Sequence, residues 1–194
     1  MKLHSFTSLL LVLTTALHAQ TAAPLDTAAA RATLAVPAKR LVSKAAAEPS
    51  PVVRRSYGKS AKGVDVEILD RADGRREERP YVAVPILFVK NSDELLDTVS
   101  RSNVRELAAI VRDFTAKGAR FTIQGHASAE GDAQHNHSLS DRRAAKIRSL
   151  LVDGHGLEAS SLSATGFGAS CATAPATAPE SELQKDRRVL VVKD

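Results

Sequence analysis

The chain has 194 residues, of which 43% are hydrophobic but only 4% aromatic, and none is tryptophan. This length suits one ordinary domain with extensions, and the composition allows a core only if that core is mainly aliphatic. The net charge of +5 is concentrated in residues 20–60, where seven Lys and Arg residues stand against two acids, whereas residues 81–194 hold fourteen of each sign. Aromatic residues are not interleaved with the basic ones in the way that would favour a nucleic-acid partner, so none is expected.

The first residues have the three parts of a secretory signal peptide. Lys2 provides a positive start, residues 6–17 are an apolar run, and small residues lead to Ala19-Gln20. The run is shorter than the about 20 residues that span a bilayer. We therefore expect residues 1–19 to be cleaved as a signal peptide. The mature protein is then expected in the periplasm or cell envelope, with association to the outer membrane as a further expectation.

Residues 20–60 are rich in alanine, proline, serine and basic side chains. Such a segment buries too little apolar surface to offset the entropy of ordering it, so a disordered basic linker is predicted, with transient helix at most around residues 25–34. As a second hypothesis, its positive charge is expected to attract anionic polymers of the envelope.

Order is predicted to begin near Val64, where apolar and polar residues alternate with the period of a strand. A turn at Asp73-Gly74 and a second extended run over residues 81–89 follow. We therefore predict a β-hairpin extension over residues 61–81 and a domain over residues 82–194.

Two amphipathic helices alternate with short strands in that domain. Apolar residues at three- and four-residue steps predict a first helix that ends at Lys117-Gly118, and a second that begins after its N-cap Ser140 and ends at Gly154. The alternation predicts an α+β fold, a two-layer sandwich of βαβαβ type with a mixed sheet and helices on one face. The other predicted elements are strands over residues 121–125, 162–167 and 188–192, a polar loop over 126–136 and a long loop over 170–185.

Several reactive side chains have ordinary explanations. The lone Cys171 cannot form an internal disulfide, so it is expected to be a tolerated loop thiol or to link two copies in a homodimer. His126 and Ser128 lack the orienting group and oxyanion site of a hydrolase. The histidines at 126, 135, 137 and 155 lack the converging ligands of a zinc site. No enzyme activity, cofactor or metal is therefore expected.

The segment over residues 125–144 has the most specific pattern in the chain, G-H-A-S-A-E-G-D-A-Q-H-N-H-S-L-S-D-R-R-A. It resembles the signature of the OmpA C-terminal-like family, G-H-T-D-x-x-G-x-x-x-x-N-x-x-L-S-x-x-R-A. Segments 85–88, 166–168 and 187–189 are similar to the flanks of that family. The matching positions are Gly125, His126, Gly131, Asn136, Leu139, Ser140, Arg143 and Ala144.

The resemblance implies an OmpA-like fold over roughly residues 82–193 and a non-catalytic module that binds peptidoglycan through the diaminopimelate of its stem peptide. That ligand end has an amine and a carboxylate on one carbon, so it needs an acid and an arginine. The resemblance assigns the carboxylate to Arg143, which the predicted helix start places near free N–H groups. It assigns the lining of the pocket to Asn136, Leu139 and either Arg187 or Arg188.

The sequence departs from the family where its Thr-Asp pair is replaced by Ala127-Ser128. A hydroxyl has no charge, and a charge-assisted hydrogen bond is worth about 1.5–3 kcal/mol against about 1 for a neutral one, so affinity should fall roughly ten-fold unless another acid compensates. Glu130 in the same loop is our hypothesis for that acid. The alternative is a protein-interaction module in which the peptidoglycan pocket is altered or lost, a reading that Ala127-Ser128 favours.

Overall fold

The computed structural model of the chain describes residues 21–42 and 54–194, so the signal peptide expected over residues 1–19 lies outside the described part. Within that part, no helix is long and apolar enough to cross a membrane. The elements are α1 (Thr27–Ala35), β1 (Lys39–Val42), β2 (Arg54–Lys59), β3 (Asp65–Asp70), β4 (Arg75–Val84), α2 (Thr98–Thr115), β5 (Phe121–Gly125), α3 (Ala133–Ser149), β6 (Leu162–Gly166), α4 (Glu180–Asp186) and β7 (Val189–Lys193), with short helical turns at Leu150–Gly154 and Ala159–Ser161.

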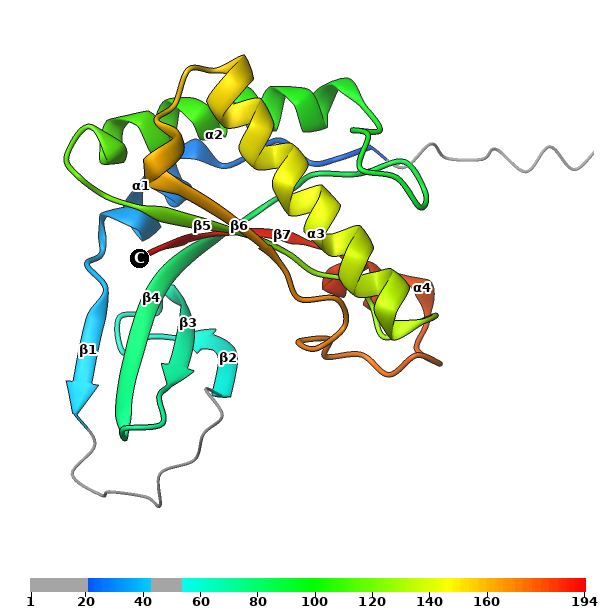
Figure 1. Cartoon of the computed structure of the whole chain (residues 1–194), viewed down its shortest axis with the longest axis horizontal. Coiled ribbons are helices and arrows are strands. Elements are labelled where there is room, and N and C mark those ends of the chain that lie inside the picture. The colour runs from blue at the N-terminus through cyan, green and yellow to red at the C-terminus, as the bar shows by residue number, and fades with distance from the viewer. Residues whose placement is uncertain (1–20, 43–53) are drawn as a thin grey trace, which may run out of the picture.

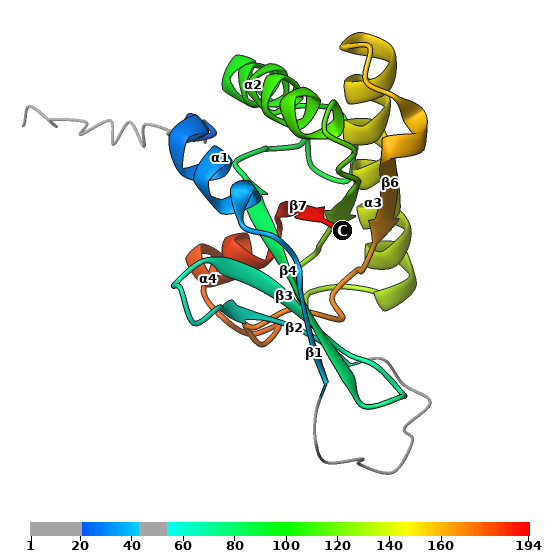
Figure 2. The same cartoon turned by 90° about the vertical axis from the view of Figure 1, so that its left-hand side faces the viewer.

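The described strands form one mixed sheet in the order β2-β3-β4-β7-β5-β6, and β1 pairs with β4 beside this path. β5 is parallel to β6 and antiparallel to β7. α1, α2 and α3 lie on one side of the sheet, as two views at right angles show (Figures 1 and 2). The predicted α+β fold with a mixed sheet and helices on one face is therefore confirmed.

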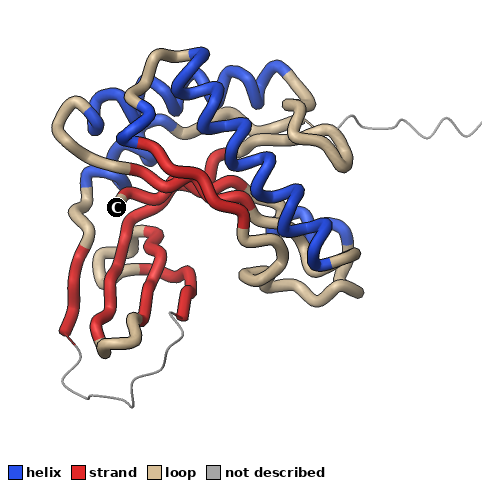
Figure 3. The backbone as a smooth tube through the Cα atoms, viewed as in Figure 1, coloured by secondary structure: helices blue, strands red, loops and turns tan. Residues whose placement is uncertain are grey.

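The two faces of the sheet differ in chemistry because side chains alternate along each strand. Phe121 and Ile123 of β5 point to the helices, where they join a core that is otherwise almost entirely aliphatic. Gln124, the next residue after Ile123, is fully buried on the opposite face of the sheet. The backbone trace in Figure 3 shows β2 and β3 lying below the central strands, away from the helices.

β4 joins the predicted hairpin to the domain. Its first half, Arg76 to Pro80, pairs with β3, and its second half, Tyr81 to Val84, pairs with β7. The boundary predicted between residues 81 and 82 therefore falls inside one continuous strand. The hairpin is also larger than predicted, because β2 adds a third antiparallel strand beside β3.

The structure differs from the predicted disordered linker over residues 20–60, because α1, β1 and β2 lie within it. α1 is capped by the side chain of Asp26 and buries Ala30 and Leu34. Asn103 of α2 accepts a hydrogen bond from one backbone group of the segment before α1 and donates to another. Composition favours disorder here, but two buried side chains and a few backbone hydrogen bonds suffice to dock a short helix on an existing domain.

Much of the positive charge predicted for a free tail is paired within the fold. The acids that pair with it come from α2, β3 and β4. The segment is therefore a less basic surface than its sequence indicates, and its attraction to anionic polymers stays a prediction. The four ion pairs are Arg31 with Asp113, Arg40 with Glu77, Arg55 with Glu67, and Lys59 with Asp65.

α3 begins earlier than predicted. Its N-cap is Asp132, whose side chain accepts a hydrogen bond from the backbone N–H of His135 at 2.7 Å. The prediction of Ser140 as the N-cap is therefore wrong. The start of the helix was misplaced because the first turns of α3 are polar and show no apolar stripe. Ser140 lies inside the helix, where its hydroxyl donates to the backbone oxygen of His137 and accepts from the backbone N–H of Gly168, both at 2.8 Å.

Two glycines let α3 lie directly on the sheet. A Cβ atom at Gly125 would overlap the backbone oxygen of Ser140, and one at Gly166 would overlap the backbone nitrogen of Asp141. Neither clash can be relieved by turning a side chain, because the atoms met are backbone. The glycines at the ends of β5 and β6 thus set the position of α3.

Gly166→Ala should therefore lower the free energy of unfolding by about 1–3 kcal/mol, because an extra methyl group in a packed contact forces the backbone to shift. Urea denaturation measures this loss. Gly154→Ala is the matched control, since nothing lies within 4 Å of a Cβ atom at that position. Equal stability of the two variants would contradict the close approach of α3.

The face of the sheet opposite the helices contains a buried polar network. Glu67 of β3 is fully buried and forms ion pairs with Arg55, at 2.7 Å, and with Arg79. Gln124 donates to Glu67 at 2.8 Å and accepts from the hydroxyl of Tyr57, also at 2.8 Å. These bonds connect β2 and β3 to the end of β5, from which the next loop emerges.

His126, the first residue of that loop, is buried with its ring stacked on Phe167 at 5.4 Å between centroids. Burial, and then the charges of Arg188 and Arg55, lower the pKa of His126 from 6.5 to about 3. The unfolded chain therefore binds a proton below pH 6.5 that the folded chain does not bind until about pH 3. Stability that is present above pH 6.5 is lost as the pH falls through this window.

The titration of His126 is expected to lower the free energy of unfolding by up to about 1.4 kcal/mol for each pH unit below 6.5. Urea denaturation at pH 7.5 and pH 4.5 measures it. His126→Gln should lose less stability between these two pH values than the wild type does, whereas the control His155→Gln should lose as much. The same loss in all three proteins would rule out His126 as the titrating group.

Candidate functional site

A cleft of about 640 Å³ opens between α3, α4 and the loop that follows β4. Its lining includes every residue that the sequence analysis proposed for the ligand site: Ala127, Ser128, Glu130, Asn136, Leu139, Arg143 and Arg187. Of the two candidate arginines at the start of β7, Arg187 lines the cleft. Arg188 instead pairs with Asp186 at 3.0 Å and lies over the ring of Tyr57 on the opposite face.

Other residues of the lining were missed by the sequence analysis: Lys90, Asn91, Gly131, His135, Glu180 and Gln184. Glu180 and Gln184 lie on α4, in a stretch predicted to be loop throughout. Pro179 ahead of two acidic residues in the first turn of α4 is a helix-start signal that could have found it.

Arg143 forms one wall of the cleft. It lies beyond the middle of α3, so the predicted position near free helix N–H groups is wrong. Its guanidinium donates from Nε to the backbone oxygen of Ser92 at 3.0 Å and from Nη2 to that of Val89 at 3.4 Å. It also lies over the ring of Phe88, 4.8 Å from the centroid. These contacts fix the guanidinium without neutralising its charge.

The surroundings of Arg143 favour an anion. Burial lowers the pKa of Arg143, and the charges of Arg187 and Arg142 lower it further. A guanidinium has five N–H donors. The hydrogen bonds to Ser92 and Val89 use two of them, so donors remain for a ligand. A carboxylate placed there would gain charge-assisted hydrogen bonds and offset the repulsion between the arginines.

The opposite wall is built around Arg187, whose guanidinium contacts acidic side chains instead of facing the open space of the cleft. Nε donates to the hydroxyl of the buried Ser128 at 3.1 Å, Nη2 to Glu130 at 2.5 Å, and Nη1 to Glu180 at 2.5 Å. Hydrogen bonds to Glu180 first, and also to Glu130, raise the pKa of Arg187. The Ser128 side chain therefore has no charge of its own but shares Arg187 with two carboxylates.

Asn136 holds the loop of this wall in place. Its Nδ2 donates to the backbone oxygens of Glu130, at 2.6 Å, and Ser128, at 3.3 Å. The loop is also fixed at its start, where the N–H of Ala127 donates to the backbone oxygen of Gly168 at 2.8 Å. Asn136 is therefore a residue that positions the acids of the loop rather than one free to contact a ligand.

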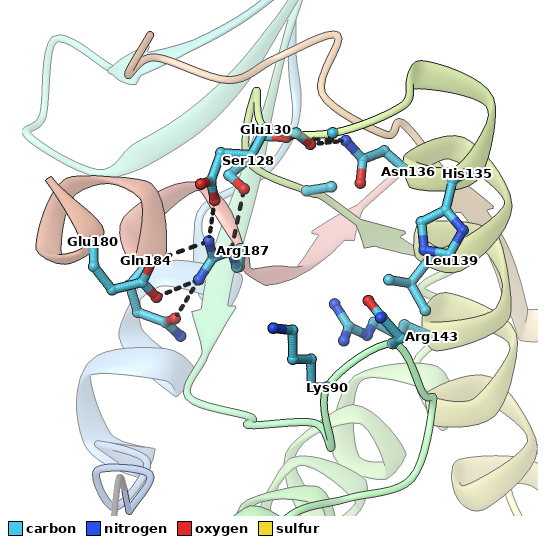
Figure 4. A pocket seen from close by; sticks show the side chains of 13 residues that line it. Lys90, Ser128, Glu130, His135, Asn136, Leu139, Arg143, Glu180, Gln184 and Arg187 are labelled. Atoms are coloured by element: carbon cyan, nitrogen blue, oxygen red, sulfur yellow. Dashed lines mark hydrogen bonds and ion pairs between the residues drawn. The ribbon is translucent and has the colours of Figure 1, made fainter. Parts of the chain in front are cut away.

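The two walls give the cleft opposite charges on its two sides. Figure 4 shows Arg143 on α3 lying across the opening from Ser128, Glu130 and Arg187, with Lys90 between the two walls. Arg143 makes one side cationic. On the other side, two carboxylates share one guanidinium, which leaves a negative charge. Such a cleft matches a small group that has both a carboxylate and an amine.

Other chemistry has less support in the described structure. Among residues 21–42 and 54–194, no group of three or more His, Cys, Asp or Glu side chains is arranged to hold a metal ion. Burial raises the pKa of the Cys171 thiol, which lowers the fraction of reactive thiolate. A homodimer linked through Cys171 stays a prediction.

Comparisons with known proteins agree with this arrangement. Residues 87–188 match the model of the OmpA family. A stretch of 71 residues, 37% of this chain, is 31% identical to outer membrane porin F of Pseudomonas aeruginosa and covers 20% of that protein, so the chain matches about a fifth of its relative.

Two solved structures share the fold. The periplasmic domain of Helicobacter pylori MotB has a TM-score of 0.51 and 17% identity over 72% of this chain and 87% of that one. A MotB-like protein from Desulfovibrio vulgaris has a TM-score of 0.50 and 21% identity over 72% of this chain and 78% of the other. At these identities the likeness describes the fold alone.

Proposed function

The chain belongs to the OmpA family, and we propose that it binds peptidoglycan non-covalently through this cleft, by the diaminopimelate residue of the stem peptide and without catalysis. Arg143 carries the proposal. Within the described structure its hydrogen bonds go to backbone oxygens only, so its charge faces the cleft without a carboxylate partner. The fold thus presents a positioned guanidinium to an anion that residues 21–42 and 54–194 do not supply.

The ligand end that the family resemblance implies fits the two sides of the cleft. Its carboxylate would accept hydrogen bonds from Arg143, whose planar guanidinium suits such a group. Its amine would lie at the opposite wall, near the hydroxyl of Ser128 and the carboxylate of Glu130. Loss of the aspartate at position 128 is therefore compensated in part by acids that reach the same wall from elsewhere.

A place in the cell envelope is part of the same proposal. One matched relative is a porin described as an outer membrane protein. The expected signal peptide over residues 1–19 agrees with export. There the cleft would attach or localise the protein to the cell wall.

Co-sedimentation with purified, protein-stripped peptidoglycan tests the proposal. The mature chain should be retained, free meso-diaminopimelate should release it, and raised salt should weaken retention only modestly because the charges lie in a partly buried cleft. Retention that salt abolishes and meso-diaminopimelate does not affect would contradict the proposal. The absence of any retention would favour the alternative, a protein-interaction module that has lost this ligand.

Glu130→Gln should weaken retention by roughly ten-fold, because the ligand's ammonium loses the attraction of a carboxylate and keeps only a hydrogen bond to an uncharged amide oxygen. The change keeps the shape of the side chain, and Asn136 still holds the backbone of the loop. Glu106→Gln, an exposed acid on α2, is the control and should bind as the wild type does. Equal retention of the Glu130→Gln variant and the wild type would remove Glu130 from the site.

A further inference from the structure

The donors of Arg187 are all engaged within the wall of the cleft. Besides the hydrogen bonds to Ser128, Glu130 and Glu180 given above, Nη1 donates to Gln184 at 3.3 Å, and Nη2 donates to the second carboxylate oxygen of Glu180 at 3.2 Å. These contacts match the five N–H groups of a guanidinium one for one. Arg187 therefore has no directed donor left for a ligand carboxylate, although it lines the cleft.

What Arg187 does instead is gather two carboxylates from distant parts of the chain. Glu130 comes from the loop before α3 and Glu180 from the start of α4. The hydrogen bond from Arg187 lowers the pKa of Glu180, and the charge of Lys90 also contributes, so Glu180 is ionised at neutral pH. Two carboxylates held by one guanidinium leave one negative charge on this wall, which the charge of Lys90 faces.

The two acids keep room for another donor. A carboxylate offers about four lone-pair sites. Arg187 donates one hydrogen bond to Glu130 and one to each oxygen of Glu180, so sites on both acids remain for another donor. Together with the hydroxyl of Ser128, the wall offers acceptors on three side chains. An ammonium group has three donors, so the number and the charge of the groups agree.

The geometry points to Glu180 as a second acceptor for the ligand's amine, and so as a residue that makes the cleft prefer an amino-carboxylate over a plain dicarboxylate. This inference rests on the proposed function, because it concerns the same cleft. Arg187 is then a positioning residue, which acts on the ligand through the two acids it holds. Glu180 compensates for the charge that Ser128 lacks.

A purely structural role for Glu180 makes a different prediction. If its ion pair with Arg187 only fastens α4 to the sheet, removing its charge should weaken the binding of every ligand in the cleft to the same degree. If Glu180 receives the amine, the loss should fall on ligands that have an amine. The ratio of the affinities for two matched ligands, one with and one without an amine, therefore distinguishes the two roles. The affinity for one ligand alone does not.

The test uses meso-diaminopimelate and pimelate, which have the same carbon chain and the same two carboxylates, but pimelate has no amine. Each is used to displace the mature chain from purified peptidoglycan, and the concentration that halves retention is measured. The wild type should require roughly 100-fold less meso-diaminopimelate than pimelate, in line with one ionic contact of the amine with each of the two acids. Glu180→Gln should reduce this preference to about ten-fold, which Glu130 still provides.

Glu182→Gln is the matched control, because Glu182 lies on the same helix but pairs with Lys185. It should keep the preference of the wild type. A Glu180→Gln variant that keeps the full preference would overturn the inference, and the proposed function would stand if Arg143→Ala weakens retention by roughly 100-fold. A wild type that neither compound displaces would overturn both. The side chain of Glu180 is 66% exposed, so the variant is expected to fold.

Discussion

Arg143→Ala should reduce retention on peptidoglycan by roughly 100-fold, the largest effect expected for any single change in the cleft. The residue is expected to make charge-assisted hydrogen bonds to the ligand carboxylate, each worth about 1.5–3 kcal/mol, and 1.4 kcal/mol corresponds to one decade in affinity. No other guanidinium can substitute, because the donors of Arg187 are engaged by Glu130, Glu180 and their neighbours. Sedimentation with increasing amounts of peptidoglycan measures the loss.

Arg142→Ala is the matched control for this change. Arg142 precedes Arg143 on α3 but is exposed, and its Nη1 donates to the hydroxyl of Ser138 at 2.8 Å, away from the lining of the cleft. This variant loses the same charge and should bind as the wild type does. Equal loss in both variants would mean that retention depends on overall charge rather than on a carboxylate site at Arg143.

Glu67→Ala should lower the free energy of unfolding by about 3–5 kcal/mol, the range found when one partner of a buried ion pair is removed. The substitution leaves the charges of Arg55 and Arg79 partly buried without the carboxylate that they share, and Nε of Arg79 already has no hydrogen-bond partner in the described structure. Gln124 would also lose the acceptor of its Nε2 group. Urea denaturation at pH 7.5 measures the change.

Asp65→Asn is the control for Glu67, since it lies on the same strand but forms an exposed ion pair with Lys59. Such surface pairs contribute about 0–1 kcal/mol, so little stability should be lost. Comparable losses in the two variants would contradict the account of a buried network that holds β2 and β3 against the sheet. Where Glu67→Ala remains folded, its retention on peptidoglycan should match that of the wild type, because the network lies on the opposite face from Arg143.

The central strands and α2 were predictable because their apolar residues repeat with the period of the element that they form. β5 has the bounds predicted for it, and α2 ends close to the predicted glycine stop. The start of α3 was not predictable in this way, because its first turns face solvent and the cleft. α1 was predicted only as transient helix over residues 25–34 for a related reason: only Ala30 and Leu34 of the helix are buried, which is too few residues to show a stripe.

The residues of the site were found through their register with a family signature, not through their periodicity or spacing. From that register, Ser128, Asn136 and Arg143 were predicted to line one site, and the structure places all three in one cleft. It could not show that Arg187 is saturated by acids, because that depends on where α4 places Glu180. It also could not show how the contacts of Gly125 and Gly166 set the position of α3, since these contacts join residues far apart in the sequence.

Binding of diaminopimelate in the cleft is tested most directly by a titration of the ¹⁵N-labelled mature chain with meso-diaminopimelate, followed by NMR. We expect saturable shifts, with one shared affinity, in the side-chain Nε–H of Arg143 and in the backbone amides of Ser128 and Glu130. Resonances of β1 and β2 should remain unchanged. No shifts at saturating ligand, or shifts confined to residues outside the cleft, would show that the cleft is not a site for this ligand.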